Sequence, residues 1–194
     1  MRHSVFTLEV CARFDQRREL LGALRAIAGE APAEVSRGEA WFRHRSAATI
    51  LTTHFDVLER GCWDYFDDEA RARATFDDWC APILKKEVPR ATPSGLPDGY
   101  RETGPRYLTF TFVYLLAYGS PSDLAMREAC AIPEPSLWTR RTFRKLLAAV
   151  SALSFASVKS DAMYMAPRDE EWGLTTEDLA AATYEYLRPI VEGL

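Results

Sequence analysis

Residues 106–118 constrain the fold more than any other part of the chain. One face of an extended strand over this segment carries Leu108, Phe110, Phe112, Tyr114 and Leu116, and the other carries Thr109, Thr111, Val113 and Leu115. Apolar side chains on both faces are typical of a strand at the centre of a sheet that is covered on both sides. The segment therefore predicts a central strand with packing above and below it.

Two further segments are expected to join this strand in one sheet. Residues 4–14 alternate between apolar and more polar positions, and residues 154–166 form a third predicted strand. Helical patterns are found at about 16–28, 39–60, 67–80, 120–130, 136–153 and 175–190. We therefore expect an α+β fold, in which a small sheet of about three strands near 4–14, 106–118 and 154–166 packs with about six helices.

The chain is expected to form a single globular domain over residues 1–194. Prolines and glycines crowd residues 89–105 and predict an internal loop. We interpret this loop as a joint within one domain, because neither flank looks able to bury its one-sided strand alone. No internal repeat is visible in the sequence.

Several features favour a cytoplasmic location. The longest uninterrupted apolar run, residues 112–118, is far shorter than the roughly 20 residues that a membrane-spanning helix needs. Residues 1–4 lead directly into the first predicted strand, so no signal peptide is expected. The four cysteines, Cys11, Cys62, Cys80 and Cys130, form no C-x-x-C pair and are expected to be reduced and buried.

The sequence lacks the motifs of the common enzyme and cofactor sites. It contains no G-x-S-x-G nucleophile elbow and no phosphate-binding glycine loop. A zinc site needs three or four ligands, and among the three histidines His54 has only apolar neighbours on its predicted helix. We therefore expect no catalytic residue, no metal and no cofactor, and the sequence leans against an enzyme.

Charged residues are segregated along the chain. Acidic side chains gather at Asp64, Asp67, Asp68, Glu69, Asp77 and Asp78, and basic ones on one helix face at Arg140, Arg141, Arg144 and Lys145. Each patch is either a solvated helix face or a functional surface. The acidic patch would dock a basic partner, and the basic patch would bind an anion or an acidic protein. Trp172 lies in a predicted turn and is either an exposed binding anchor or a residue packed on the sheet edge.

An alternative hypothesis places a ligand site or an active site on the sheet. Glu9 and Arg13 share one face of the first predicted strand, and Lys159 and Asp161 share one face of the third. If these strands are neighbours, the four side chains form a charged ladder. Such a ladder is either a set of exposed ion pairs or, under a covering helix, an ionisable pocket for a small ligand or a reaction.

These observations predict a non-enzymatic, cytoplasmic protein-interaction module, either an adaptor or a subunit of a complex. Its expected partner is another protein, which would contact the segregated acidic and basic faces. The net charge of −4 gives no general attraction to nucleic acid, so nucleic-acid binding by the helix of Arg140 is a weaker third hypothesis. No membrane span is expected, and self-association stays open.

The C-terminal half resembles an uncharacterised domain family of membrane-anchored, glycine-rich cyanobacterial and plastid proteins. The resemblance rests on residues 107–111, 122–124, 162–167 and 174–179, and residues 5–13 and 20–28 are similar in placement. The chain departs from the family by lacking its membrane segment and glycine-rich stretch. The resemblance implies a fold unit of unknown function and supplies no catalytic residue.

Overall fold

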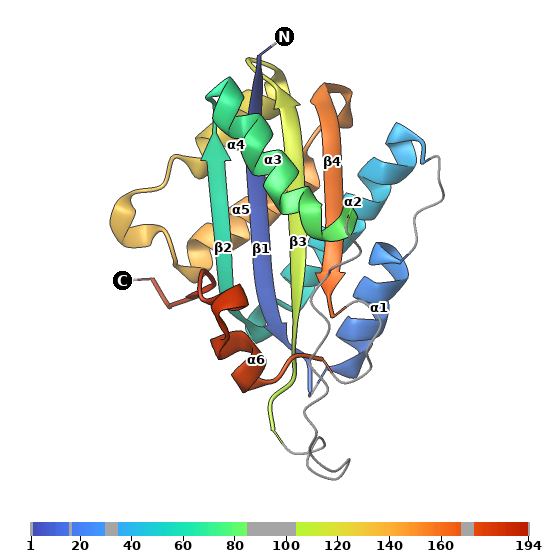
Figure 1. Cartoon of the computed structure of the whole chain (residues 1–194), viewed down its shortest axis with the longest axis vertical. Coiled ribbons are helices and arrows are strands. Elements are labelled where there is room, and N and C mark those ends of the chain that lie inside the picture. Colours follow the sequence, from blue (N-terminus) through green and yellow to red (C-terminus); the bar gives the residue numbers. More distant parts are fainter. Residues whose placement is uncertain (1, 16, 30–34, 85–103, 168–172, 194) are drawn as a thin grey trace.

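The computed structural model describes residues 2–15, 17–29, 35–84, 104–167 and 173–193. These segments form one antiparallel sheet with helices on both faces (Figure 1). The strands are β1 (His3–Arg13), β2 (Leu58–Phe66), β3 (Tyr107–Ala117), β4 (Val158–Ala166) and β5 (Arg188–Pro189), in the spatial order β4-β3-β1-β2-β5. The α+β class agrees with the prediction, but the predicted number of about three strands is wrong, because the sheet has five.

The sequence pattern does not predict the two additional strands, β2 and β5, and the structure shows why. The helix expected over 39–60 ends at Thr53, and a 3-10 turn at Phe55–Val57 leads into β2. In the sequence, Val57 and Leu58 continue the helical stripe, while the polar residues and glycine at 59–61 hide the start of the strand. β5 has only two residues, one of them Pro189, so it has no periodicity and depends on its pairing with β2.

Four helices cover one face of the sheet. These helices are α1 (Arg18–Ala28), α2 (Arg37–Thr53), α4 (Pro121–Cys130) and α5 (Arg140–Ala152), and α2, α4 and α5 lie behind the sheet in Figure 1. Their apolar stripes pack on the aromatic side of β1 and β3, where Phe6, Phe110 and Phe112 are fully buried. This layer is the main hydrophobic core.

The opposite face is covered less evenly. α3 (Glu69–Leu84) crosses one end of the sheet, and α6 (Thr176–Ala180) lies over the other end (Figure 1). A small apolar cluster lies under α3 around Val5 and Leu115, and another lies under α6 around Cys11 and Leu179. Between these two clusters the sheet presents polar side chains of β1 and β3.

The structure repeats one order of elements twice. β1, α1, α2, a 3-10 turn, β2 and α3 are followed by β3, α4, α5, a 3-10 turn, β4 and α6, and the second series has an additional 3-10 turn at Glu134–Ser136 between α4 and α5. Each 3-10 turn begins at a phenylalanine, Phe55 or Phe155, and each following strand skips one residue in its pairing, Glu59 or Lys159. β2 and β4 therefore occupy equivalent outer positions, and β5 extends the sheet only on the side of β2.

Several predicted helix ends are confirmed. Gly29 caps the C-terminus of α1, and the Ser120 side chain caps α4 by accepting the backbone N–H of Asp123. A reciprocal capping box joins Thr175 and Asp178 at the start of α6. The final helix itself is shorter than predicted, because α6 ends at Ala180 and does not continue through residue 190.

Candidate functional site: a groove at the outer edge of β2

The outer edge of β2 is paired over only part of its length. β5 pairs with Arg60 and Gly61, and the N–H of Ile190 donates to the carbonyl of Glu59 at 2.8 Å. Pro189 has no N–H, so this pairing runs through the residues on either side of Arg60. Backbone groups alternate along a strand, and therefore Trp63 and Tyr65, like Gly61, direct their N–H and C=O to this outer edge.

The C-terminal segment fills a slot that is one strand wide. On the side away from β2, the N–H of Val191 donates to the carbonyl of Trp138 at 2.9 Å, and the N–H of Arg140 donates to the carbonyl of Val191 at 2.8 Å. Thr139 and Val191 form a parallel bridge. The segment thus lies between β2 and the chain at 138–140, with backbone hydrogen bonds on both sides.

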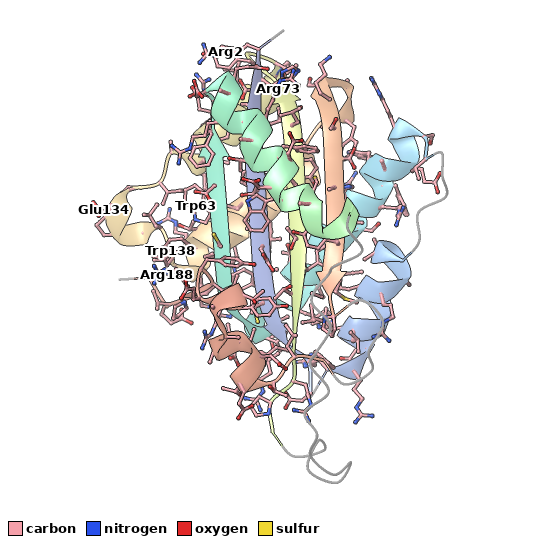
Figure 2. All side chains as sticks on the ribbon, viewed as in Figure 1. Arg2, Trp63, Arg73, Glu134, Trp138 and Arg188 are labelled. Atoms are coloured by element: carbon pink, nitrogen blue, oxygen red, sulfur yellow. The ribbon has the colours of Figure 1, made fainter. Side chains whose placement is uncertain are left out.

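Further along β2, the same side of the strand opens into a groove of about 500 Å³. Figure 2 places Trp63, Trp138 and Arg188 along the outer side of β2, with Glu134 farther out. The groove is lined by Trp63, Asp64, Tyr65, Arg127, Cys130, Ala131, Ile132, Leu137 and Trp138. Its lining is mostly aromatic and aliphatic, and a few polar groups lie at its margin, which is typical of a site that binds an apolar side chain.

The aromatic side chains are held by hydrogen bonds to neighbouring elements. The indole Nε1–H of Trp63 donates to the carbonyl of Leu137 at 3.1 Å, which ties β2 to the loop before α5. The hydroxyl of Tyr65 donates to the carboxylate of Asp123 at 2.5 Å. Burial, together with this hydrogen bond, raises the pKa of Tyr65 to about 12. The phenol therefore stays neutral and remains the hydrogen-bond donor to Asp123.

Asp123 anchors this end of the groove. Its side chain is fully buried, and it accepts hydrogen bonds from the Ser4 hydroxyl and, at 2.7 Å, from the backbone N–H of Gly119. Arg127 lies one helical turn further along α4, with a nitrogen 3.1 Å from the carboxylate of Asp67. These contacts fix the α4 wall of the groove against β1 and β2.

Asp64 is the acidic residue of the lining, and its side chain lies on the face of β2 opposite to Trp63 and Tyr65. Burial raises its pKa, and the positive charge of Arg71 opposes this shift. Within the described segments, no hydrogen bond or ion pair reaches its carboxylate. Asp64 is thus a half-buried anion beside an open strand edge.

A second polar cluster lies inside the molecule, on the face covered by α3 and α6. Glu9 is only 3% exposed, and Tyr186 donates to its carboxylate at 2.8 Å. Burial raises the pKa of Glu9, and the hydrogen bond from Tyr186 opposes the shift. Thr109 and Thr111 on β3 also lie beside Glu9 and oppose the shift, whereas the buried hydroxyl of Thr7 on β1 has no hydrogen-bond partner in the described part of the chain.

The structure does not bring Glu9, Arg13, Lys159 and Asp161 together. β3 separates β1 from β4, and the skipped pairing at Lys159 breaks its alternation with Asp161. Arg13 pairs with Asp15 at 2.7 Å. Asp161 lies 2.9 Å from Nε2 of His44 on the helix-covered core side, opposite to the face of Glu9.

The predicted acidic residues are spread over several local roles. Asp67 pairs with Arg127, and Asp68 accepts the backbone N–H of Arg71 at 2.9 Å. Asp77 and Asp78 are exposed on α3, whereas only Asp64 lines the groove.

The predicted basic residues lie at α5, and most contact their own chain. Arg140 donates to the carbonyl of Phe55 at 3.0 Å, the guanidinium of Arg144 stacks on the ring of Phe55, and Lys145 donates to the carbonyl of Glu128 at 3.0 Å. Arg141 is exposed. Trp172 lies outside the described residues.

Sequence reasoning missed Trp63, Tyr65, Arg127 and Trp138. The first two belong to β2, where the sequence pattern predicts a helix through residue 60 and no strand after it, so Trp63 and Tyr65 have no predicted sheet face. Their alternation with Cys62, Asp64 and Phe66 was the available signal. Trp138 becomes part of the site only through the loop that returns beside β2.

Comparisons of the chain with family models, with curated proteins and with solved structures gave no match. The family resemblance therefore stays a prediction. In the segments that the structure describes, no helix combines the length and apolar character needed to cross a bilayer. Over the same segments, no three His, Cys, Asp or Glu side chains gather as metal ligands.

Proposed function

We propose that this chain is a non-enzymatic protein-interaction module, an adaptor or a subunit of a complex, and that it binds another protein at the groove beside β2. One observation carries the proposal. A slot one strand wide is filled by the C-terminal segment beside Arg60 and Gly61, and it continues as an open, aromatic groove beside Trp63 and Tyr65. Open strand edges are a common attachment point for other chains.

The composition of the groove supports a protein partner. Tryptophan, tyrosine and arginine are the residues that contribute most to binding at protein interfaces, and Trp63, Tyr65, Arg127 and Trp138 lie together here. The hydrogen bonds of Trp63 and Tyr65 hold both rings in place, which lowers the entropy lost on binding. The exposed acidic residues Asp77 and Asp78 on α3 and the exposed Arg141 on α5 provide charged surfaces away from the groove.

The proposal includes a cytoplasmic location. All four cysteines carry free thiols, which suits a reducing compartment. Burial raises the pKa of each thiol, to about 12 for Cys62 and Cys130 and about 11 for Cys80, so these groups are poor nucleophiles at neutral pH. Unreactive thiols agree with a binding role.

A matched pair of variants tests this function. Ala131 lines the groove and is exposed, so Ala131→Arg adds a long cation at the groove without removing core packing. Ala148→Arg makes the same change at an exposed position of α5, outside the groove lining. Both variants should retain the wild-type circular dichroism spectrum and melting temperature.

The readout is a quantitative affinity capture from extracts of the native host at low salt. We expect a protein captured by the wild type and by Ala148→Arg to be reduced at least tenfold with Ala131→Arg. Equal capture by all three proteins would refute the groove as the docking site. Recovery of the free chain alone would count against an interaction module.

A further inference from the structure

We infer that the partner docks as an extended strand: it pairs antiparallel with the outer edge of β2, buries apolar side chains against Trp63 and Tyr65, and places a basic side chain opposite Asp64. This inference rests on the proposed function, because it names the partner of the same groove. It goes beyond that function in fixing the backbone conformation and the order of side chains in the bound segment.

The shape of the slot comes from the chain itself. The C-terminal segment already lies there as a strand, bonded to Glu59 on one side and to Trp138 and Arg140 on the other. It runs antiparallel to β2, which sets the direction expected for a second segment in the same slot. In the described chain no strand pairs with the outer edge of residues 62–66, a length of roughly 17 Å at about 3.3 Å per residue.

The backbone geometry fixes which bonds the segment makes. Trp63 and Tyr65 direct their N–H and C=O outward, so each is able to exchange two hydrogen bonds with the residue directly opposite in an antiparallel partner. These two partner residues need free backbone N–H groups. The partner residue between them, opposite Asp64, directs its own N–H away from β2.

The side chains follow the same alternation. Residues opposite Trp63 and Tyr65 face the helix-covered side, where the aromatic rings and Ile132 and Trp138 form an apolar floor and wall. The residue opposite Asp64 faces the other side, toward a half-buried carboxylate that has no ion-pair partner in the described chain, although the charge of Arg71 on α3 acts on it from farther away. Pairing would remove more water from this carboxylate, so a lysine or arginine opposite it stabilises the complex, and an acidic residue there destabilises it.

Asp64 also explains how the edge selects its partner. A charge near an exposed strand edge disfavours unspecific pairing with other strands. A segment that carries an apolar–basic–apolar pattern turns this unfavourable group into a favourable contact, whereas a uniformly apolar strand leaves the carboxylate buried and unpaired.

The probe is a capped pentapeptide, Thr-Val-Lys-Val-Thr, titrated into the full chain labelled with ¹⁵N. We expect chemical-shift changes centred on the Trp63 indole and on the amides of Trp63 and Tyr65, and slower solvent exchange of both amides. The peptide Thr-Val-Glu-Val-Thr should bind at least about threefold more weakly. Asp64→Lys should reverse this preference, while Asp64→Asn should remove it.

N-methylation of the peptide distinguishes backbone pairing with β2 from attraction between the side chains alone. Methylation of the two valine nitrogens removes both donors to β2 and should weaken binding about tenfold or more, whereas methylation of the lysine nitrogen should leave it nearly unchanged. Equal effects of the two methylations, or a charge preference that ignores Asp64, would overturn the inference. A mixed outcome is that Ala131→Arg abolishes capture of the natural partner while the peptides show one of these two contrary results. In that case the proposed function stands, and only binding as a strand is refuted.

Discussion

Tyr186 donates a hydrogen bond to Glu9 at 2.8 Å, although the two residues are 177 positions apart in the chain. Glu9 lies in the middle of β1, and Tyr186 lies on the C-terminal segment just before β5. The contact closes the polar interior between α3 and α6. The same segment then continues into the slot beside β2, so the buried carboxylate and the docking groove share one structural element.

The buried position of Glu9 makes the stability of the protein depend on pH. Its pKa is raised in the folded state, so the folded protein binds this proton more tightly than the unfolded chain, whose glutamate titrates near 4.5. The contribution of Glu9 to the free energy of unfolding therefore falls as pH rises from below 4.5 through the raised value. Glu9→Gln removes the titration and should be more stable than the wild type at pH 7.

Urea unfolding of the wild type and Glu9→Gln at a series of pH values from 4 to 8 measures this effect. The difference in unfolding free energy should grow in favour of the variant as pH rises. Glu128→Gln changes an exposed glutamate on α4 and should show a difference that is nearly constant with pH. A constant difference for Glu9→Gln would mean that Glu9 is not protonated more readily in the folded protein.

His44 links α2 to two strands of the core. Its Nδ1 lies 2.6 Å from the hydroxyl of Tyr114, and its Nε2 lies 2.9 Å from the carboxylate of Asp161. Burial holds the pKa of Tyr114 well above its usual value, so the phenol keeps its proton where it hydrogen-bonds with Nδ1 of His44. His44→Leu leaves the Tyr114 hydroxyl buried without a partner and should lower the unfolding free energy by about 2–4 kcal/mol.

A double-mutant cycle isolates this contact. Tyr114→Phe removes the orphaned hydroxyl, so the loss in the double variant should be smaller than the sum of the two single losses by about 1 kcal/mol. Chemical denaturation of all four proteins gives the coupling energy. Additive losses would show that the hydroxyl and the imidazole stabilise the fold independently.

The sequence predicted the elements whose own residues carry a strong pattern. β1 and β3 alternate over eleven residues each and were placed to within about one residue, and α5 has a clear apolar stripe. The predicted ranges 120–130 and 175–190 start at the observed caps Ser120 and Thr175, because a helix cap needs only neighbouring residues. β2 and β5 were missed because their strand conformation depends on pairing with distant segments.

Local sequence patterns do not predict the candidate groove, for the same reason. It forms where Trp63, the end of α4 and the loop before α5 meet, and no short stretch of sequence contains these three parts. The sequence predicts that Glu9 lies on the more polar face of its strand, and the structure agrees. The burial of Glu9 results from α3 and α6, which cover that face of the sheet. Alternation alone assigns a side chain to a face and does not say what covers that face.

Asp123 carries more hydrogen bonds than a helix cap requires. It accepts from Ser4, from Tyr65 at 2.5 Å and from the N–H of Gly119 at 2.7 Å. Asp123→Ala leaves these donors without an acceptor and should lower the unfolding free energy by about 3–5 kcal/mol. Ser120→Ala removes only the side-chain cap of α4 and should cost about 1 kcal/mol. Thermal and urea unfolding compare the two variants, and equal losses would contradict a structural role of Asp123 beyond the helix end.

The absence of a side chain at Gly61 allows β2 to lie close to both α5 and the neighbouring strand β1. A Cβ atom at this position would lie 2.8 Å from Cζ of Phe143 and 2.9 Å from the backbone carbonyl oxygen of Glu9. The ring can move slightly, but the carbonyl belongs to the central strand β1 and is fixed by the sheet. Gly61→Ala should therefore lower the unfolding free energy by about 1–3 kcal/mol.

Gly22 provides the matched control. It lies inside α1, and a Cβ atom there meets nothing within 4 Å, so Gly22→Ala should raise stability by about 0.5–1 kcal/mol through the better helix propensity of alanine. In a Phe143→Leu background, and measured against Phe143→Leu alone, the loss caused by Gly61→Ala should be only partly smaller, because the smaller side chain relieves the ring contact and leaves the contact with the Glu9 carbonyl. Complete disappearance of the loss would show that the ring alone excludes a side chain at this position. Urea unfolding of the wild type, Gly61→Ala, Phe143→Leu and the double variant decides between the two outcomes.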